Sequence, residues 1–229
     1  MSRTPVLEIL RPAAKATAFL AGSAVGLSLI ISLPLGLIAA YRQGSWIDRI
    51  ITLLTQLGIV IPNYWLAPVL VLIFSLSLGW LPSAGWREPA HYILPIVTLS
   101  SAPSAYFTRI TRSTVIEVLL SDYIRTAHAK GLREIQIAIH HALRNALIPV
   151  LTMASVWLAG LLGGTVIVEV IFAIPGLGSV LYSATLASDV PILQAGILLL
   201  FGAAVIINTC TDILYAFLNP TIRLGLKKG

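Results

Sequence analysis

The longest polar stretch of the chain occupies residues 121–149 and reads SDYIRTAHAKGLREIQIAIHHALRNALIP. It gathers four basic residues and three histidines around Gly131, in a chain of 229 residues that is 57% hydrophobic and only 10% charged. Soluble domains carry about 25% charged residues. The composition therefore indicates an integral membrane protein, in which this stretch is a polar connection between apolar helices.

The apolar runs on either side of this stretch have the length of membrane-spanning helices. A bilayer core requires about 20 apolar residues per helix, and five runs between charged residues meet that length. We expect helices at residues 16–41, 52–80, 92–115, 147–170 and 192–217. Pro62 is able to kink the second of these, and the third is the most polar. The sequence predicts an all-α polytopic transmembrane helical bundle of about five spans.

Basic residues indicate the orientation of these spans, because short cytoplasmic loops are enriched in Lys and Arg. Residues 109–144 hold six of the 15 basic residues, and placing that segment in the cytoplasm puts eleven inside and four outside. We expect an amphipathic N-terminal segment at 1–15, a transmembrane domain at 16–218 with a cytoplasmic loop at about 119–146, and a cytoplasmic tail at 219–229. A net charge of +6 is then explained by topology, so nucleic-acid binding is set aside.

The polar stretch itself predicts two short helices. Ser121 is suited to cap a helix over residues 122–130, and Gly131 is suited to end it, because glycine readily adopts a left-handed backbone. A second helix over about 132–146 has apolar residues at helical spacing: Leu132, Ile135, Ile139 and Leu143. Such a segment either lies on the membrane surface, held by anionic lipid, or docks into another protein.

The particular residues of the stretch and their order favour docking to another protein. The stretch places Tyr123, Arg125, Thr126, Ala127, Ala129, Lys130, Gly131 and Leu132 before the run HALRNALIP at 141–149. This resembles the EAA-type coupling loop of ABC importer permeases, in the form found in the dipeptide, oligopeptide and nickel subfamily. The resemblance implies that small residues near the glycine let a short helix enter a groove on a partner ATPase. Arg125 stands where the family motif has its glutamate.

The resemblance extends over nearly the whole chain. GGTVIVE at 163–169 and FAIPGLG at 172–178 are similar to the family's approach to its last extracytoplasmic loop, and DVP at 189–191 to the start of its final helix. Asn208, Asp212, LYA at 214–216, NP at 219–220 and IR at 222–223 are similar to its close. The family usually has one more helix than this chain, and residues 3–15 resemble the extracytoplasmic segment that follows it, which would explain why a basic N-terminal tail lies outside.

The resemblance implies a transport subunit that works in an assembly. Its partners would be a second permease subunit, two ATPase subunits, an extracytoplasmic solute-binding protein and the lipid of a prokaryotic cytoplasmic (inner) membrane. The sequence has no Walker motif, so we expect no enzyme activity and no bound cofactor in this chain, with ATP and Mg in the partner ATPases. Short peptides are the expected solutes, and nickel or a metal chelate is the alternative.

Several further residues are candidates for structural or gating roles: Pro149, Gly163, Gly164, Glu169, Pro175, Gly176, Gly178, Asn208 and Asp212. Glu169 is expected to stabilise the loop at 175–176 rather than to contact solute, and Asn208 with Asp212 to make an interhelical polar contact. Arg109 and Arg112 are expected to anchor a helix at the inner headgroups.

The remaining alternatives lack the residues that they require. Adjacent residues on a helix diverge by about 100°, so His140 and His141 do not share a face, and neither His91 nor His128 completes a metal cluster. A stand-alone secondary transporter would need paired charges at broken midplane helices in two matched halves, and no matched halves appear. No nucleophile and base pair indicates an enzyme.

Overall fold

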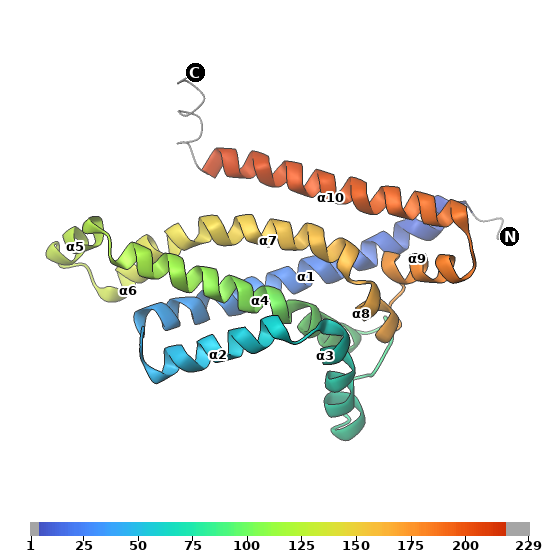
Figure 1. The fold of residues 1–229 in the computed structure, drawn as a ribbon, viewed down its shortest axis with the longest axis horizontal. Coiled ribbons are helices and arrows are strands. Elements are labelled where there is room, and N and C mark those ends of the chain that lie inside the picture. Colours follow the sequence, from blue (N-terminus) through green and yellow to red (C-terminus); the bar gives the residue numbers. More distant parts are fainter. Residues whose placement is uncertain (1–4, 219–229) are drawn as a thin grey trace, which may run out of the picture. The chain divides into compact units, whose positions relative to one another are not determined.

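The computed structural model describes residues 5–218, together with the side chains as far as residue 211 and that of Ile213. Every regular element in this range is helical and none is a strand, which confirms the all-α expectation (Figure 1). The elements are α1 (Val6–Tyr41), α2 (Trp46–Val60), α3 (Asn63–Leu70), the π-helix η1 (Val71–Ser77), α4 (Ala90–Leu119), α5 (Asp122–Ala129), α6 (Glu134–Gln136), the π-helix η2 (Ile137–Leu143), α7 (Arg144–Gly164), α8 (Val166–Ile171), α9 (Leu177–Leu186) and α10 (Val190–Leu218). The tail expected at 219–229 lies outside the described residues.

Three helices of the described range are long and apolar enough to cross a membrane: Val6–Tyr41, Glu134–Gly164 and Val190–Thr211. A fourth span exists if α2 and the α3–η1 helix, which are strongly bent at their junction, count as one broken span. The third expected span, at 92–115, coincides with α4, whose 30 residues extend about 45 Å at about 1.5 Å per residue. Its length suffices for a bilayer, but its composition is too polar for it to count among the spans.

The helix boundaries differ from the expected ones in three places. The expected N-terminal segment is continuous with the first span from Val6 onward. The second run is interrupted before Asn63, because Pro62 has extended backbone angles and also disfavours helix in the residue that precedes it. The fourth span begins earlier than expected and ends at Gly164, so that residues 166–171 form the separate helix α8.

The described chain forms two compact units. Unit 1 comprises residues 5–27, 61–101 and 157–207, and unit 2 comprises residues 28–60, 102–156 and 208–218. Four helices, α1, α4, α7 and α10, therefore contribute residues to both units.

The core of unit 1 includes the packing of α9 against α1 and α10. Leu10, Ala13 and Leu177 are its buried residues, and Leu181 and Leu199 are among the partly buried residues packed on them. Figure 1 shows α9 beside the first turns of α10. Three aromatic rings, Phe19, Trp86 and Tyr92, contact one another at centroid distances of 4.5–5.8 Å. Aliphatic side chains thus fix α9 on α1 and α10, and the three rings join α1 to the start of α4.

The core of unit 2 connects α1, α4, α5 and the helix that leads into α7. One cluster has Ala40, Val115, Ala142 and Ala146 at its centre, and another has Ile124, Ala127 and Ile137. Val118 and Leu119 of α4 pack on both clusters. These two residues make one continuous apolar layer from the end of α1 to the polar stretch.

Candidate functional site

The polar stretch begins with helix α5, whose limits follow the prediction closely. Ser121 stands at the N-cap with extended backbone angles, but its hydroxyl donates to the carbonyl of Val118 and makes no capping bond. The helix ends at Ala129, one residue before the expected end, and Gly131 has a φ of +77°. The amide of Gly131 donates to the carbonyl of His128 at 2.9 Å. The glycine therefore closes the helix in a conformation that other residues adopt only with strain.

Most of the residues predicted to dock are exposed on this segment: Tyr123, Arg125, Thr126, Ala129, Lys130, Gly131 and Leu132. Ala127 is the exception, because it is only 5% exposed and packs with Ile124 and Ile137. Ala127 thus belongs to the core beneath the helix, and the small residue on the outer face is Ala129. Arg125 lies near Asp122 at 3.4 Å, with both side chains in solvent.

Helix α5 is attached to the base of α7 by polar contacts as well as by its core. The side-chain amide of Asn145 donates to the carbonyl of His141 at 2.7 Å and to the hydroxyl of Tyr123 at 3.2 Å. The rings of Tyr123 and His141 are 6.3 Å apart. Tyr123 thereby connects the exposed helix to the helix that continues as a membrane span.

The apolar face expected for the second helix of the stretch is largely exposed, and a different face packs on the core. Leu132, Ile135 and Ile139 are 37%, 61% and 48% exposed. The buried side chains between 134 and 146 are instead Ile137, Ala138, Ala142 and Ala146. Alanines allow closer helix approach than leucine or isoleucine, and the π-helical turns of η2 change the angular step between residues. The 3.6-residue spacing of the long aliphatic residues therefore located an exposed apolar face and gave no indication of the small residues that pack on the core.

The histidines of the stretch do not converge. His128 lies 3.4 Å from Glu134, and both side chains are well exposed. His140 and His141 are consecutive in η2. Among the described residues, no three His, Cys, Asp or Glu side chains come close enough together to hold a metal ion.

The second group of predicted residues surrounds Glu169 in unit 1, which is fully buried. Its carboxylate accepts hydrogen bonds from the hydroxyls of Thr17 and Thr165, at 2.6 and 2.7 Å, and from the amide of Ser179 at 2.9 Å. The Thr17 hydroxyl in turn accepts from the amide of Leu177 at 2.8 Å. Three donors from α1, the α7–α8 junction and α9 thus converge on one side chain.

Two glycines of the loop before and within α9 make room for this carboxylate. A Cβ on Gly176 would collide with the carboxyl group of Glu169, and one on Gly178 would lie 2.9 Å from its Oε2 and 2.7 Å from the Cα of Val166. Both glycines are buried, whereas Pro175 between the two helices is exposed. The glycines let the loop close over the carboxylate, so Glu169 holds α9 by direct bonds.

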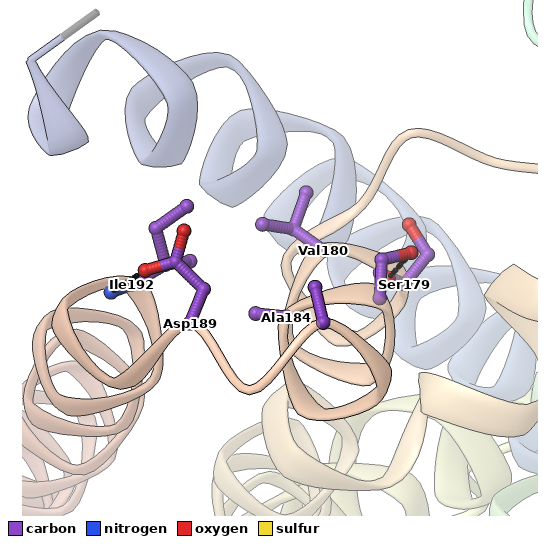
Figure 2. Close-up of a pocket in the computed structure, with 7 residues that line it drawn as sticks. Ser179, Val180, Ala184, Asp189 and Ile192 are labelled. Atoms are coloured by element: carbon purple, nitrogen blue, oxygen red, sulfur yellow. Dashed lines mark hydrogen bonds between the residues drawn. The ribbon is translucent and has the colours of Figure 1, made fainter. Parts of the chain in front are cut away.

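A shallow hollow of about 300 Å³ lies between α9 and the start of α10 (Figure 2). Ser179, Ser183 and Asp189 are its polar lining residues. Asp189 caps α10, since its carboxylate accepts from the amide of Ile192 at 3.3 Å, and the Ser183 hydroxyl donates to the carbonyl of Ser179 at 2.9 Å. These polar groups are engaged in holding the turn between the two helices.

The other predicted residues are not brought together. Pro149 lies inside α7, and Gly163 and Gly164 are exposed with open space around them. Asn208 is exposed on α10, and the side chain of Asp212 lies outside what the structure describes. The expected contact between these two therefore lies outside the described side chains.

The structure also reveals a pair that the sequence reasoning missed. Arg112 donates from Nε and a terminal nitrogen to the two oxygens of Asp48, at 2.6 and 2.8 Å. Arg112 therefore belongs to an ion pair within unit 2, which corrects its expected role as a headgroup anchor. Arg109 remains exposed, with its guanidinium 5.2 Å from the ring centre of Tyr106. The two partners are 64 positions apart in sequence, and no local pattern joins them.

Comparison with known families identifies the family to which this chain belongs. A model of the family described as "Binding-protein-dependent transport system inner membrane component" matches residues 32–224. The chain belongs to this family. It is an inner-membrane permease subunit of an ABC importer, and its location in the inner membrane of a prokaryote agrees with the expectation from sequence. The family description ties such a permease to a binding protein.

Individual proteins resemble this chain in sequence and in fold. The chain is 40% identical over 223 residues to the glutathione transport system permease protein GsiC of Escherichia coli K12. The aligned residues make up 97% of this chain and 73% of the relative. The corresponding protein of Pectobacterium atrosepticum matches with the same identity and coverage. The fold resembles that of the inward-facing MetNI methionine ABC transporter, with a TM-score of 0.78 and 19% identity over 96% of this chain and all of the other.

Proposed function

We propose that this permease imports short peptides of the glutathione type, driven by ATPase subunits that dock on α5. The observation that carries the docking is the exposed surface of α5, with small and basic side chains ending at the left-handed Gly131. The similarity to glutathione permeases supports the peptide-like solute.

The surface of α5 has the properties that an inserting helix requires. Ala129 and Gly131 are small and exposed, so a groove is able to close around them, and Arg125 and Lys130 offer charge to an acidic rim. The underside of the helix is fixed by Ile124 and by the core beneath it. A force on α5 then moves α7 and the end of α4 rather than deforming the loop.

The energy source in this proposal lies outside the chain. ATP and Mg would bind in two partner ATPases, and closure of these subunits would favour one of two membrane conformations through the docked helices. A second permease subunit would complete the passage, and an extracytoplasmic binding protein would deliver the solute. This chain would contribute the path and the docking surface and no bound cofactor.

The test is uptake by membrane vesicles that contain the whole transporter. Radiolabelled glutathione, a labelled dipeptide and labelled nickel are supplied with the binding protein and with ATP inside the vesicles. We expect ATP-dependent uptake of glutathione or the dipeptide and none of nickel. Uptake of nickel alone would replace the peptide assignment with the metal alternative.

Docking is tested separately by retention of the ATPase subunits on the purified permease. Ala129→Trp enlarges the exposed small residue of α5, and Ile197→Trp, on an exposed position of α10, is the matched control. We expect the first variant to lose the ATPase subunits and the second to retain them. Equal retention by both variants would mean that the ATPases bind elsewhere.

A further inference from the structure

Asp48 carries more hydrogen bonds than the start of a helix requires. The hydroxyl of Ser45 accepts from the amide of Asp48 at 3.3 Å, and the carboxylate of Asp48 accepts from the amide of Gly44 at 2.9 Å. These bonds already cap α2 in a manner close to a capping box. The bidentate bonds from Arg112 are additional, and they come from another helix.

The pair lies largely within the packed interior of unit 2 rather than on its surface. The side chain of Asp48 is 6% exposed and that of Arg112 is 30% exposed. A buried ion pair contributes little net stability compared with apolar residues of the same size, because both charges lose their hydration. The effect that remains is geometric, since the bidentate fork fixes the position and orientation of one helix on the other.

The pair attaches α2, which contributes no residue to the apolar layer described above. Helix α1 is already held close to α4, because a Cβ on Gly36 would lie 2.8 Å from the carbonyl oxygen of Thr108. The end of α1 also packs with α4 through Ala40 and Val115. Helix α2 follows the turn after α1, and its first turn is fixed to α4 at Arg112.

A continuous path then leads from this pair to the docking helix. Arg112 lies seven residues before the end of α4, which is roughly 10 Å along the helix axis. Val118 and Leu119, at that end, pack on the core formed by Ile124, Ala127 and Ile137 beneath α5. Packed side chains thus connect α5 to α4, and the ion pair connects α4 to α2.

We propose that Asp48 and Arg112 are positioning residues for energy coupling, which make α2 move as one body with α4 and the docking helix. This inference rests on the proposed docking of ATPases at α5. In the intact transporter, the pair stays formed while the ATPases close, and it carries their movement into the first half of the chain. Without it, ATP would still be hydrolysed, but less of the movement would open the passage.

The test compares variants of the pair in the assembled transporter. Asp48→Asn combined with Arg112→Gln removes both charges, so no unpaired charge is left buried. The matched control, Arg49→Gln with Glu117→Gln, removes one exposed base from α2 and one exposed acid from α4. The readouts are the amount of permease in the membrane, retention of the ATPase subunits, and labelled glutathione or dipeptide imported per ATP hydrolysed.

We expect the neutral double variant to retain its ATPase subunits and to import at least about fivefold less solute per ATP, the lower end of typical coupling effects. The control should equal the parent, and the exchanged pair, Asp48→Arg with Arg112→Asp, should recover part of the ratio. An unchanged ratio in the neutral double variant would overturn the inference.

Two other outcomes are equally decisive. If the neutral double variant fails to accumulate, Arg112→Lys is tested instead, because it keeps the positive charge and loses only the bidentate contact to Asp48. An unchanged amount of solute imported per ATP in that variant would show that the pair is purely structural and would overturn the inference. If the unaltered permease retains no ATPase subunits, the docking proposal fails first. If it retains them and only the ratio is unaffected, the docking proposal stands and the positioning role fails.

Discussion

The exposed helix α5 and the loop around Glu169 both combine small residues with glycines, yet their glycines serve different purposes. Around Gly131 no neighbouring atom lies within reach of an added Cβ, and the residue is required for its backbone angle. Around Gly178 the backbone has φ in the ordinary range, and the residue is required because Val166 and Glu169 occupy the space. Gly131 therefore serves the backbone turn at the end of an exposed helix, whereas Gly178 serves internal packing.

The charged side chains of the two regions differ in the same way, because one is bonded within the chain and the other faces solvent. The carboxylate of Glu169 has three donors within the chain and no exposure. Arg125 has one weak contact in solvent, which contributes little to stability. Variants of the Glu169 region should therefore change folding, and variants of the exposed face of α5 should change assembly and coupling.

The largest effect is expected for Glu169→Ala. The change leaves the hydroxyls of Thr17 and Thr165 and the amide of Ser179 without their acceptor, and each buried unsatisfied group costs about 1–3 kcal/mol. We expect the free energy of unfolding, measured by denaturation in detergent, to fall by about 3 kcal/mol or more. Glu169→Gln retains one acceptor oxygen and should lose less. Wild-type stability of the alanine variant would contradict the structural role.

The next comparison separates the two faces of α5. Ala127→Glu forces a long carboxylate into the core beside Ile124 and should lower the free energy of unfolding by about 3 kcal/mol. Ala129→Glu is on the exposed face and should change it by less than about 0.5 kcal/mol, while it reduces retention of the ATPase subunits. Denaturation curves and copurification measure the two quantities. The reverse assignment of effects would place the docking face on the other side of the helix.

The third comparison concerns glycines that differ only in their surroundings. Gly178→Ala brings a Cβ against Val166 and Glu169, and overpacking of this kind costs about 1–3 kcal/mol. Gly163→Ala, in α7, meets no atom within 4 Å and should be neutral or stabilise by up to about 1 kcal/mol, because alanine favours helix. Equal unfolding curves for the two variants would remove the packing argument at the loop.

The sequence predicted α5 and its stop closely because the signals are local. Asp122 and Gly131 influence the backbone within a few residues of themselves, so the helix and its end are predictable from the local sequence, although Ser121 makes no capping bond. The partners of Glu169 and Asp48 were not predictable in this way. Thr17 is 152 positions from Glu169 and Arg112 is 64 positions from Asp48, and only the packed fold brings them together.

The apolar face of the second helix shows a different limit of sequence reasoning. The regular spacing of Leu132, Ile135 and Ile139 predicted an apolar face for the membrane surface or a partner, and these side chains are exposed, whereas the structure buries the alanines at 138, 142 and 146. Hydrophobicity ranks the long aliphatic residues first, whereas close helix packing selects the small ones. Periodicity therefore located the outward apolar face but not the face that packs on the core.

The sharpest test of the comparison is Gly131→Ala, whose expected loss of stability is smaller than that of Glu169→Ala or Ala127→Glu. A left-handed backbone costs a residue with a Cβ about 1–2 kcal/mol. Gly79 is the matched control, since it has a φ of +64° and equally open surroundings but lies outside the docking segment. Gly131→Ala and Gly79→Ala should therefore lower the free energy of unfolding by similar amounts of about 1 kcal/mol. Only Gly131→Ala should also lower the amount of solute imported per ATP, because the strained turn shifts the end of α5 in its groove. Equal import ratios for the two variants would reduce Gly131 to an ordinary helix stop and would return the segment to the status of a loop on the membrane surface.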